Sequence, residues 1–289
     1  MLSPQLQNAL QRLRLASTKA QASQGVGERM SAAKGSGIEF ADHRPYHIGD
    51  DVRHIDGKAF ARWGKLYTKE YQLYQKLPTI VLLDNSLSMH GDASKWEQAQ
   101  QLALALSYLV LKQHDILQVG LIEGERVYWL KTAWHLSQLA TITKALQRPA
   151  LAAKSLREVF HNSAPHFPPK ALSVLISDLW FGDFAEGLKY LALLQQDVVV
   201  FHTLSATEID PSHLGEATRL QDSESGNYVD VALTPERIAA YQQALAKHGD
   251  GIREALRYGG GRYQFLCSED ALRDVLLGNC VRAGILEAS

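Results

Sequence analysis

Three oxygen-bearing side chains stand at alternate positions directly after the short apolar run of residues 79–83. They are Asp84, Ser86 and Ser88. Alternate residues of an extended segment point to the same side, so one carboxylate and two hydroxyls would face one point. A second apolar run, residues 171–177, also ends in an aspartate, Asp178. Carboxylates, hydroxyls and water suit Mg²⁺ or a similar hard cation, so these four residues are the candidate metal ligands. Because Asp and Ser also end strands and cap helices, a plain turn is the alternative at this position.

A second group of polar residues lies in the segment 38–77. Between Glu39 and Glu70 it holds six acids, six bases and three histidines, interleaved with aromatic residues. Isolated surface ion pairs contribute little to stability, typically under about 1 kcal/mol. The segment is therefore either a packed polar network or a recognition surface, with a solvated charged face as the third interpretation. The residues that we select as candidate partner-binding positions are Arg44, Asp50, Asp51, Arg53 and Asp56.

The elements that must position these residues follow from apolar periodicity. Apolar runs predict strands over residues 79–84, 116–122, 171–178, 197–204 and 262–267, with a hairpin partner at 126–131. Helical patterns cover residues 94–113, 135–147, 155–162, 183–195, 235–257 and 269–282. Weaker signals predict a strand at 66–74, two short strands within 216–233, and a short helix near the N-terminus. Residues 16–37, rich in Ala, Ser, Gln and Gly, are typical of a connector.

Apolar strands that alternate with amphipathic helices predict an α/β fold. We expect three layers, with a mostly parallel sheet of about five core strands plus one edge hairpin and helices on both faces. Ligands of such sheets bind at the carboxyl ends of the strands, so Asp84 and Asp178 should lie close together. We expect residues 79–289 to form this domain. Residues 1–78 would form an N-terminal extension, and its aromatic load favours packing on the domain.

Composition excludes several classes of protein. The chain has 289 residues, is 46% hydrophobic and carries a formal charge of −1. This balance gives no general drive toward nucleic acid or an anionic membrane. The longest near-continuous apolar stretch, Leu102–Leu111, is far shorter than the roughly 20 residues of a membrane-spanning helix. Two cysteines do not make a disulfide framework, and no signal-peptide pattern opens the chain, so we expect a cytoplasmic location.

The segment from Gly35 to Asp56, Gly-Ser-Gly-Ile-Glu-Phe-Ala-Asp-His-Arg-Pro-Tyr-His-Ile-Gly-Asp-Asp-Val-Arg-His-Ile-Asp, resembles the signature of the bacterial proteins called domain of unknown function 58. Ala61-Arg62 matches a pair that follows this signature. Asp84-x-Ser86-x-Ser88 is similar to the metal-ion-dependent adhesion site of von Willebrand factor type A domains. The resemblance covers roughly residues 2–286. The chain departs from the family at Gly57, where the family has Trp.

This resemblance implies a von Willebrand factor type A-like domain that carries a family-specific N-terminal extension. Such domains commonly complete the metal's coordination with a carboxylate from a partner. The resemblance further implies a non-enzymatic adaptor that works with a MoxR-type AAA+ ATPase in the assembly or maturation of other proteins, with Mg²⁺ as the cation. Adhesion-type sites also use a threonine from a loop that corresponds here to residues 148–155. This loop offers Ser155 as a substitute hydroxyl and Lys154 as an ammonium that would compete with a cation.

Two other functions compete with the adaptor. In the first, Asp84 is the phosphoryl-accepting nucleophile of a Mg²⁺-dependent phosphatase or phosphotransferase. Such enzymes usually place a second aspartate two residues on, where this chain has Ser86. In the second, the basic and aromatic residues of the segment 58–69 bind single-stranded nucleic acid, which the interspersed acids disfavour. The sequence contains no Gly-Lys-Ser/Thr phosphate loop and no Gly-x-Ser-x-Gly nucleophile elbow.

Overall fold

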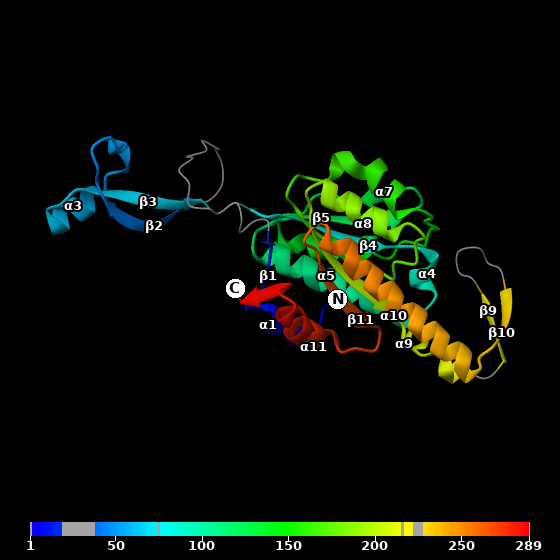
Figure 1. Cartoon of the computed structure of the whole chain (residues 1–289). Coiled ribbons are helices and arrows are strands. Elements are labelled where there is room, and N and C mark those ends of the chain that lie inside the picture. Colours follow the sequence, from blue (N-terminus) through cyan, green and yellow to red (C-terminus); the bar gives the residue numbers. More distant parts are fainter. Residues whose placement is uncertain (1, 19–37, 74–75, 215–216, 222–227, 289) are drawn as a thin grey trace. The chain divides into compact units, whose positions relative to one another are not determined.

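The computed structural model describes residues 2–18, 38–73, 76–214, 217–221 and 228–288 (Figure 1). Two compact units are present: a main unit of residues 1–25 and 77–289, and a small unit of residues 26–76. The connector predicted at residues 16–37 lies mostly outside the described residues. The two units are treated separately below, and the packing of the N-terminal extension on the main domain stays a prediction.

The main unit is built on a six-stranded sheet in the order β11-β8-β7-β4-β5-β6. Five of its strands are parallel: β4 (Pro78–Asp84), β5 (Ile116–Glu123), β7 (Leu172–Ser177), β8 (Asp197–Leu204) and β11 (Arg262–Cys267). The sixth, β6 (Arg126–Trp129), is the antiparallel hairpin partner of β5. The predicted α/β class with a mostly parallel sheet is therefore confirmed.

Helices cover both faces of this sheet (Figure 1). Val81 and Leu83 face one core with helix α5 (Ala93–Lys112), whereas Ile80 and Leu82 face a second core. The second core is closed by α7 (Leu156–Ser163), α8 (Phe184–Leu193) and the C-terminal half of α10 (Pro235–Arg257). Side chains of a strand alternate between the two faces, so β4 lies buried between two helical layers.

Shorter elements complete the main unit. Helix α4 (Leu87–His90) follows β4, α6 (Leu139–Ala145) follows the β5–β6 hairpin, and α9 (Ala206–Ile209) follows β8. Short 3₁₀ turns occupy Leu136–Gln138, Ala164–His166 and Pro211–Leu214. The predicted pair of strands within 216–233 forms as β9 (Ala217–Gln221) and β10 (Tyr228–Ala232).

The two chain termini pack together, whereas the sequence analysis placed residues 1–78 in an N-terminal extension. Helix α1 (Pro4–Leu10) places Leu10 fully in the core, and β1 (Leu13–Leu15) pairs with β12 (Leu286–Ala288). These N-terminal residues therefore belong with the main unit rather than with the extension. Near the C-terminus the single helix predicted over 269–282 is divided into α11 (Leu272–Asp274), a π turn and α12 (Cys280–Arg282). None of the helices in the described part of the chain is both long and apolar enough to cross a membrane.

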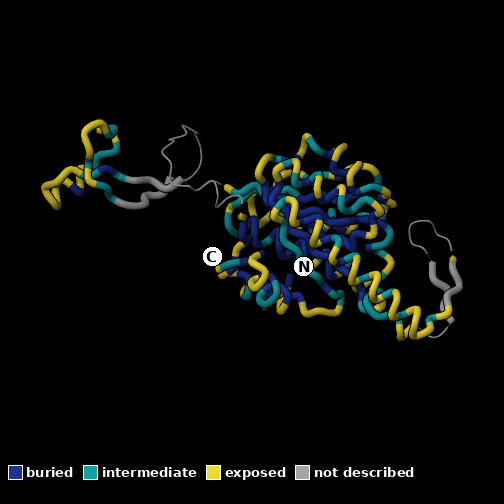
Figure 2. The backbone as a smooth tube through the Cα atoms, viewed as in Figure 1, coloured by how far each residue is buried: buried dark blue, intermediate teal, exposed yellow. Residues whose placement is uncertain are grey.

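The small unit is a two-stranded antiparallel ribbon with one helix. Strand β2 (Ile38–Pro45) pairs with β3 (Tyr67–Leu73), and between them lie a 3₁₀ turn (Val52–His54) and helix α3 (Gly57–Trp63). Asp56 caps α3 by accepting the N–H groups of Lys58 and Ala59, and Gly64 ends it at φ = 65°. Figure 2 shows that exposed and half-buried residues dominate this unit, whereas the main unit has a buried interior.

Candidate functional site

The two predicted aspartates lie at the carboxyl edge of the sheet. Asp84 is the last residue of β4, and Asp178 directly follows β7. The strands are neighbours in parallel register, with Leu83 opposite Ile176, so the residues that follow are adjacent. Both aspartates are completely buried. The structure therefore brings together the carboxylates that the sequence analysis expected at one point.

Both carboxyl oxygens of Asp84 already accept hydrogen bonds. Oδ1 accepts the N–H of Ser86 at 3.0 Å, and Oδ2 accepts the hydroxyl of Ser177 at 2.6 Å. Burial, together with the charge of Asp178, raises the pKa of Asp84 to about 7. Ser86 in turn shares a hydrogen bond of 3.0 Å between its hydroxyl and that of Ser88. The Asp-x-Ser-x-Ser group is thus a closed hydrogen-bonded turn at the start of α4.

A lysine that the sequence analysis did not select completes the site. Lys95 lies in the first turn of α5, and its side chain is fully buried. Its Nζ donates to Asp178 Oδ2 at 3.0 Å and to Glu208 Oε1 at 2.7 Å. Burial lowers the pKa of Lys95, but the two carboxylates outweigh it, so the pKa lies above its usual value. One sequence signal existed: a lysine in the first turn of a helix opposes the helix dipole and needs a reason to be there.

Glu208 reaches this lysine from α9, the short helix that follows β8. Ser205 and Glu208 form a capping box: Glu208 Oε2 accepts the Ser205 N–H at 2.7 Å, and Ser205 Oγ accepts the Glu208 N–H at 3.2 Å. From α10, Tyr241 donates its hydroxyl to the Glu208 carbonyl at 2.5 Å. The carboxylate is therefore held toward Lys95 rather than free to swing into solvent.

The loop of residues 148–155 contributes differently from what was expected. Lys154 is exposed, so the ammonium beside the carboxylates belongs to Lys95 instead. The Ser155 hydroxyl caps α7 and donates to Asp183 Oδ2 at 2.6 Å. The hydroxyl beside Asp84 comes from Ser177, at the end of β7.

Buried polar contacts tie this loop to the one that follows Asp84. The side-chain amide of Asn85 donates to Glu123 Oε1 at 3.0 Å and to the Pro149 carbonyl at 2.9 Å. The backbone carbonyl of Asn85 accepts the N–H of Leu151. Arg148 pairs with Glu123 at 2.9 Å. This network presents the side chain of Leu151 at the edge, 47% exposed.

The loop after β7 is held in an unusual backbone conformation. Leu179, directly after Asp178, is buried and has φ = 55°, a left-handed conformation that costs a non-glycine residue about 1–3 kcal/mol. The Ser177 hydroxyl accepts the Leu179 N–H at 2.8 Å, and Asp178 Oδ1 accepts the N–H of Trp180 at 3.3 Å. The result is a rigid loop that leaves Trp180 42% exposed beside the buried carboxylates.

These contacts test the expectation of Mg²⁺, and the donor set does not fit it. Mg²⁺ requires near-octahedral oxygen ligands at 2.0–2.1 Å. Asp84 already receives Ser86 and Ser177, and Asp178 Oδ2 already receives the Lys95 ammonium. Within the described residues, no group of three or more His, Cys, Asp and Glu side chains is arranged to hold a metal.

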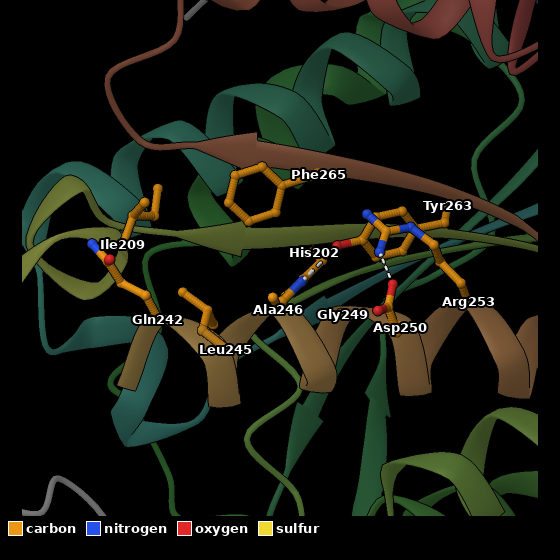
Figure 3. A pocket seen from close by; sticks show the side chains of 10 residues that line it. All are labelled: His202, Ile209, Gln242, Leu245, Ala246, Gly249, Asp250, Arg253, Tyr263 and Phe265. Carbon is orange, nitrogen blue, oxygen red and sulfur yellow. Dashed lines mark hydrogen bonds and ion pairs between the residues drawn. The ribbon is translucent and has the colours of Figure 1, made fainter. Parts of the chain in front are cut away.

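A cavity of about 360 Å³ lies between α10 and the strands β8 and β11 (Figure 3). His202, at its wall, is 1% exposed and bonds the Tyr263 hydroxyl through Nδ1 at 2.9 Å. Burial and the neighbouring His248 lower the pKa of His202 to about 3, so the ring is neutral at neutral pH. Arg253 pairs with Asp250 at 2.8 Å and lies over the Tyr263 ring. His202 is thus a buried core residue whose Nδ1 is hydrogen-bonded and whose buried Nε2 has no hydrogen-bond partner among the described residues.

The charged residues of the small unit pair mostly with one another. Arg44 binds Asp50 at 2.9 Å, and Arg53 binds Asp51 at 2.6 Å. The third acid, Asp56, accepts from His43 at 2.8 Å, which lowers the pKa of Asp56 to about 2. These pairs fold the loop that joins β2 to β3, and a role of the five selected residues in partner binding stays a prediction.

Beside charged side chains such as Arg53, the small unit also exposes large apolar ones. They are Ile48, Val52, Phe60, Trp63 and Leu66. Trp63 also packs edge-on against His43, with ring centroids 5.5 Å apart, and both line a cavity of about 450 Å³. This unit therefore offers exposed apolar surface in addition to its charged residues.

A family model described as "Protein of unknown function DUF58" matches residues 42–251. Uncharacterized proteins of Mycobacterium bovis and Mycobacterium tuberculosis are each 26% identical over 265 residues, which cover 88% of this chain and 82% of the relative. Among solved structures, the pilus adhesin SpaC of Lactobacillus rhamnosus GG is similar with a TM-score of 0.39 and 12% identity. That match covers 74% of this chain and 32% of the adhesin, so the chain spans about a third of the adhesin's length.

Proposed function

The chain belongs to the DUF58 family, and we propose that it is a non-enzymatic adaptor that binds another protein through the carboxyl edge of its sheet. The proposed fold of the main domain is von Willebrand factor type A-like. The position of the Asp-x-Ser-x-Ser turn at the end of β4, with a second aspartate at the end of the adjacent β7, supports this assignment.

One observation carries the non-enzymatic part of the proposal: Asp84 is fully buried, and both of its oxygens accept hydrogen bonds. A phosphoryl-accepting aspartate must be ionised and must reach its substrate. The raised pKa of Asp84 leaves this carboxyl only partly ionised at neutral pH, and neither cavity described above includes this residue. These features disfavour the Mg²⁺-dependent phosphatase and favour a structural role for the aspartate.

The same edge offers two of the features that protein interfaces use. Trp180 and Leu151 are large apolar side chains, 42% and 47% exposed, on two loops that pack around one buried polar cluster. Interface hot spots are rich in tryptophan and lie on rigid, well-supported surfaces. The strained loop at Leu179 and the Asn85 network supply that rigidity. We therefore propose that the binding surface consists of these two side chains together with the turn from Asp84 to Ser88.

We propose a MoxR-type AAA+ ATPase as the partner, from the resemblance of residues 35–56 to the family signature. We also propose a cytoplasmic location, which is the expectation drawn from the sequence. Because the donor set does not fit Mg²⁺, the proposed contact does not run through a bound metal. The surface instead relies on shape and apolar contact. Loss of one such anchor typically costs 2 kcal/mol or more, roughly thirtyfold in affinity.

The test is capture of a purified MoxR-type ATPase from the same organism by the full-length chain. Trp180→Ala and Leu151→Ala should each weaken capture at least tenfold. The matched control is Leu193→Ala. Leu193 is 63% exposed and is the last residue of α8, so it lies near the start of β8 rather than near the carboxyl ends of the strands. Equal capture by all three variants would contradict the proposed surface.

Enzymatic activity is tested separately with a generic aryl phosphate and Mg²⁺. We expect no turnover above that of the Asp84→Asn variant. Turnover by the wild-type chain that this variant lacks would replace the adaptor with the phosphatase.

A further inference from the structure

The ion cluster at the carboxyl edge contains a positive charge of its own. Lys95 Nζ lies 3.0 Å from Asp178 Oδ2 and 2.7 Å from Glu208 Oε1, and the lysine side chain is fully buried. We infer that the Lys95 ammonium is a built-in cation that takes the place of a divalent metal at this site. Glu208 takes the place of the carboxylate that a partner would otherwise supply.

The charge balance of the cluster supports this assignment. Asp178 is completely buried, and a buried carboxylate without a counter-charge is strongly unfavourable. Lys95 supplies that counter-charge, and the partly exposed Glu208 shares it. A divalent cation among these oxygens would lie only a few ångströms from the ammonium and would be repelled by it. Metal and lysine therefore exclude each other.

The hydrogen bonds around the site show that it is complete without metal. Asp84 already accepts the Ser86 N–H and the Ser177 hydroxyl, and a cation on Asp178 Oδ2 would have to displace Lys95. Mg²⁺ also gives up its own water reluctantly. A cation would therefore share oxygens that already accept hydrogen bonds and would lie beside the ammonium, which favours the arrangement without metal.

Glu208 is positioned before any partner arrives. Its second carboxylate oxygen accepts the Ser205 N–H at 2.7 Å, and its backbone carbonyl is held by Tyr241 from α10. The acid that contacts the cation is therefore supplied by α9 of the same chain. Removing Lys95 should leave the buried carboxylate without its counter-charge, so that a hydrated divalent ion can take the place of the ammonium.

The experiment is titration of the full-length protein with Mn²⁺, followed by calorimetry and by Mn²⁺ paramagnetic resonance. It does not depend on the proposed partner, so the two proposals can fail separately. We expect the wild-type chain to bind no Mn²⁺ at this site. We expect Lys95→Ser to bind about one equivalent, and adding Asp84→Asn to Lys95→Ser should abolish that binding.

The matched control is Lys154→Ser, which removes the exposed lysine of the neighbouring loop and should leave the protein without Mn²⁺ binding. The inference is overturned if wild type binds one equivalent that Asp84→Asn removes. It is equally overturned if folded Lys95→Ser gains no binding. Should Lys95→Ser fail to fold, the wild-type titration against Asp84→Asn alone decides the question.

Discussion

The pairing of Lys95 with Asp178 makes the sharpest stability prediction. Lys95→Met keeps most of the apolar stem but removes the ammonium, and Asp178 is then buried without a counter-charge. Breaking a buried ion pair from one side costs about 3–5 kcal/mol. For a chain of this size, 1 kcal/mol corresponds to about 2–3 °C, so the melting temperature should fall by roughly 6–15 °C.

The other single variant should behave differently because Lys95 has two partners. Asp178→Asn leaves the ammonium paired with Glu208, whose side chain is 29% exposed. We expect a cost of about 1–3 kcal/mol from the weakened interaction. The double variant Lys95→Met with Asp178→Asn has no uncompensated buried charge. Its loss of unfolding free energy should therefore be smaller than the sum of the losses of the two single variants, by up to about 3 kcal/mol.

The assay is urea and thermal unfolding of all four proteins at neutral pH in the presence of a chelator. Lys154→Met is the matched control, because this lysine is exposed and its loss should change stability by no more than about 0.5 kcal/mol. Strict additivity of the two single variants would refute the coupling. A Lys95→Met melting temperature equal to that of Lys154→Met would refute the burial of the ammonium.

Three further predictions concern single sites. Because the folded state raises the pKa of Asp84 to about 7, the folded chain keeps a proton on this carboxyl that the unfolded chain releases near pH 4. The free energy of unfolding should therefore fall as the pH rises between these values, and Asp84→Asn should flatten that slope in urea melts. Burial raises the pKa of the Cys280 thiol to about 12, so a thiol reagent should label the half-buried Cys267 first in the native protein and both cysteines equally in urea; equal native rates would contradict the burial. A methyl group added at Gly120 would lie 2.4 Å from a neighbouring side chain, so Gly120→Ala should cost about 1–3 kcal/mol in the same melts, and an unchanged midpoint would show that the core yields.

Local signals in the sequence located most of the main sheet. Apolar runs that end in Asp84 and Asp178 mark strands buried on both faces, and such runs stand out because they contain no charged residue before the aspartate. Thr234 followed by Pro235 marked the start of α10, and the structure has Thr234 as its N-cap. Each of these signals depends only on residues close together in the chain.

Contacts between distant residues could not be predicted in this way. The pairing of Leu13–Leu15 with Leu286–Ala288 joins the two ends of the chain, and neither short segment has a pattern that predicts the other as its partner. Arg262 fastens the same region by donating to the Ala16 and Gly284 carbonyls. A strand of three residues is too short to show an apolar alternation, so it can be recognised only from its pairing in the structure.

The candidate site shows the same division between local and distant information. The turn from Asp84 to Ser88 was evident from its spacing, and strand order brought Asp178 beside it. Lys95 was missed because the unfavourable interaction of a first-turn lysine with the helix dipole is small when the lysine is solvated. Its burial is explained by two distant carboxylates, Asp178 after β7 and Glu208 in α9, which lies 113 positions away.

The sheet edge and the small unit share one feature: each pairs its charged side chains internally. At the edge, Lys95 neutralises buried carboxylates; in the small unit, Arg44 and Arg53 bind nearby aspartates. A charge already paired within the chain must lose that partner before it can bind another protein, which lowers its net contribution to affinity. Exposed apolar side chains carry no such cost. Recognition is therefore expected from Trp180 at the edge and from Trp63 in the small unit, while the charged residues hold the loops that present them.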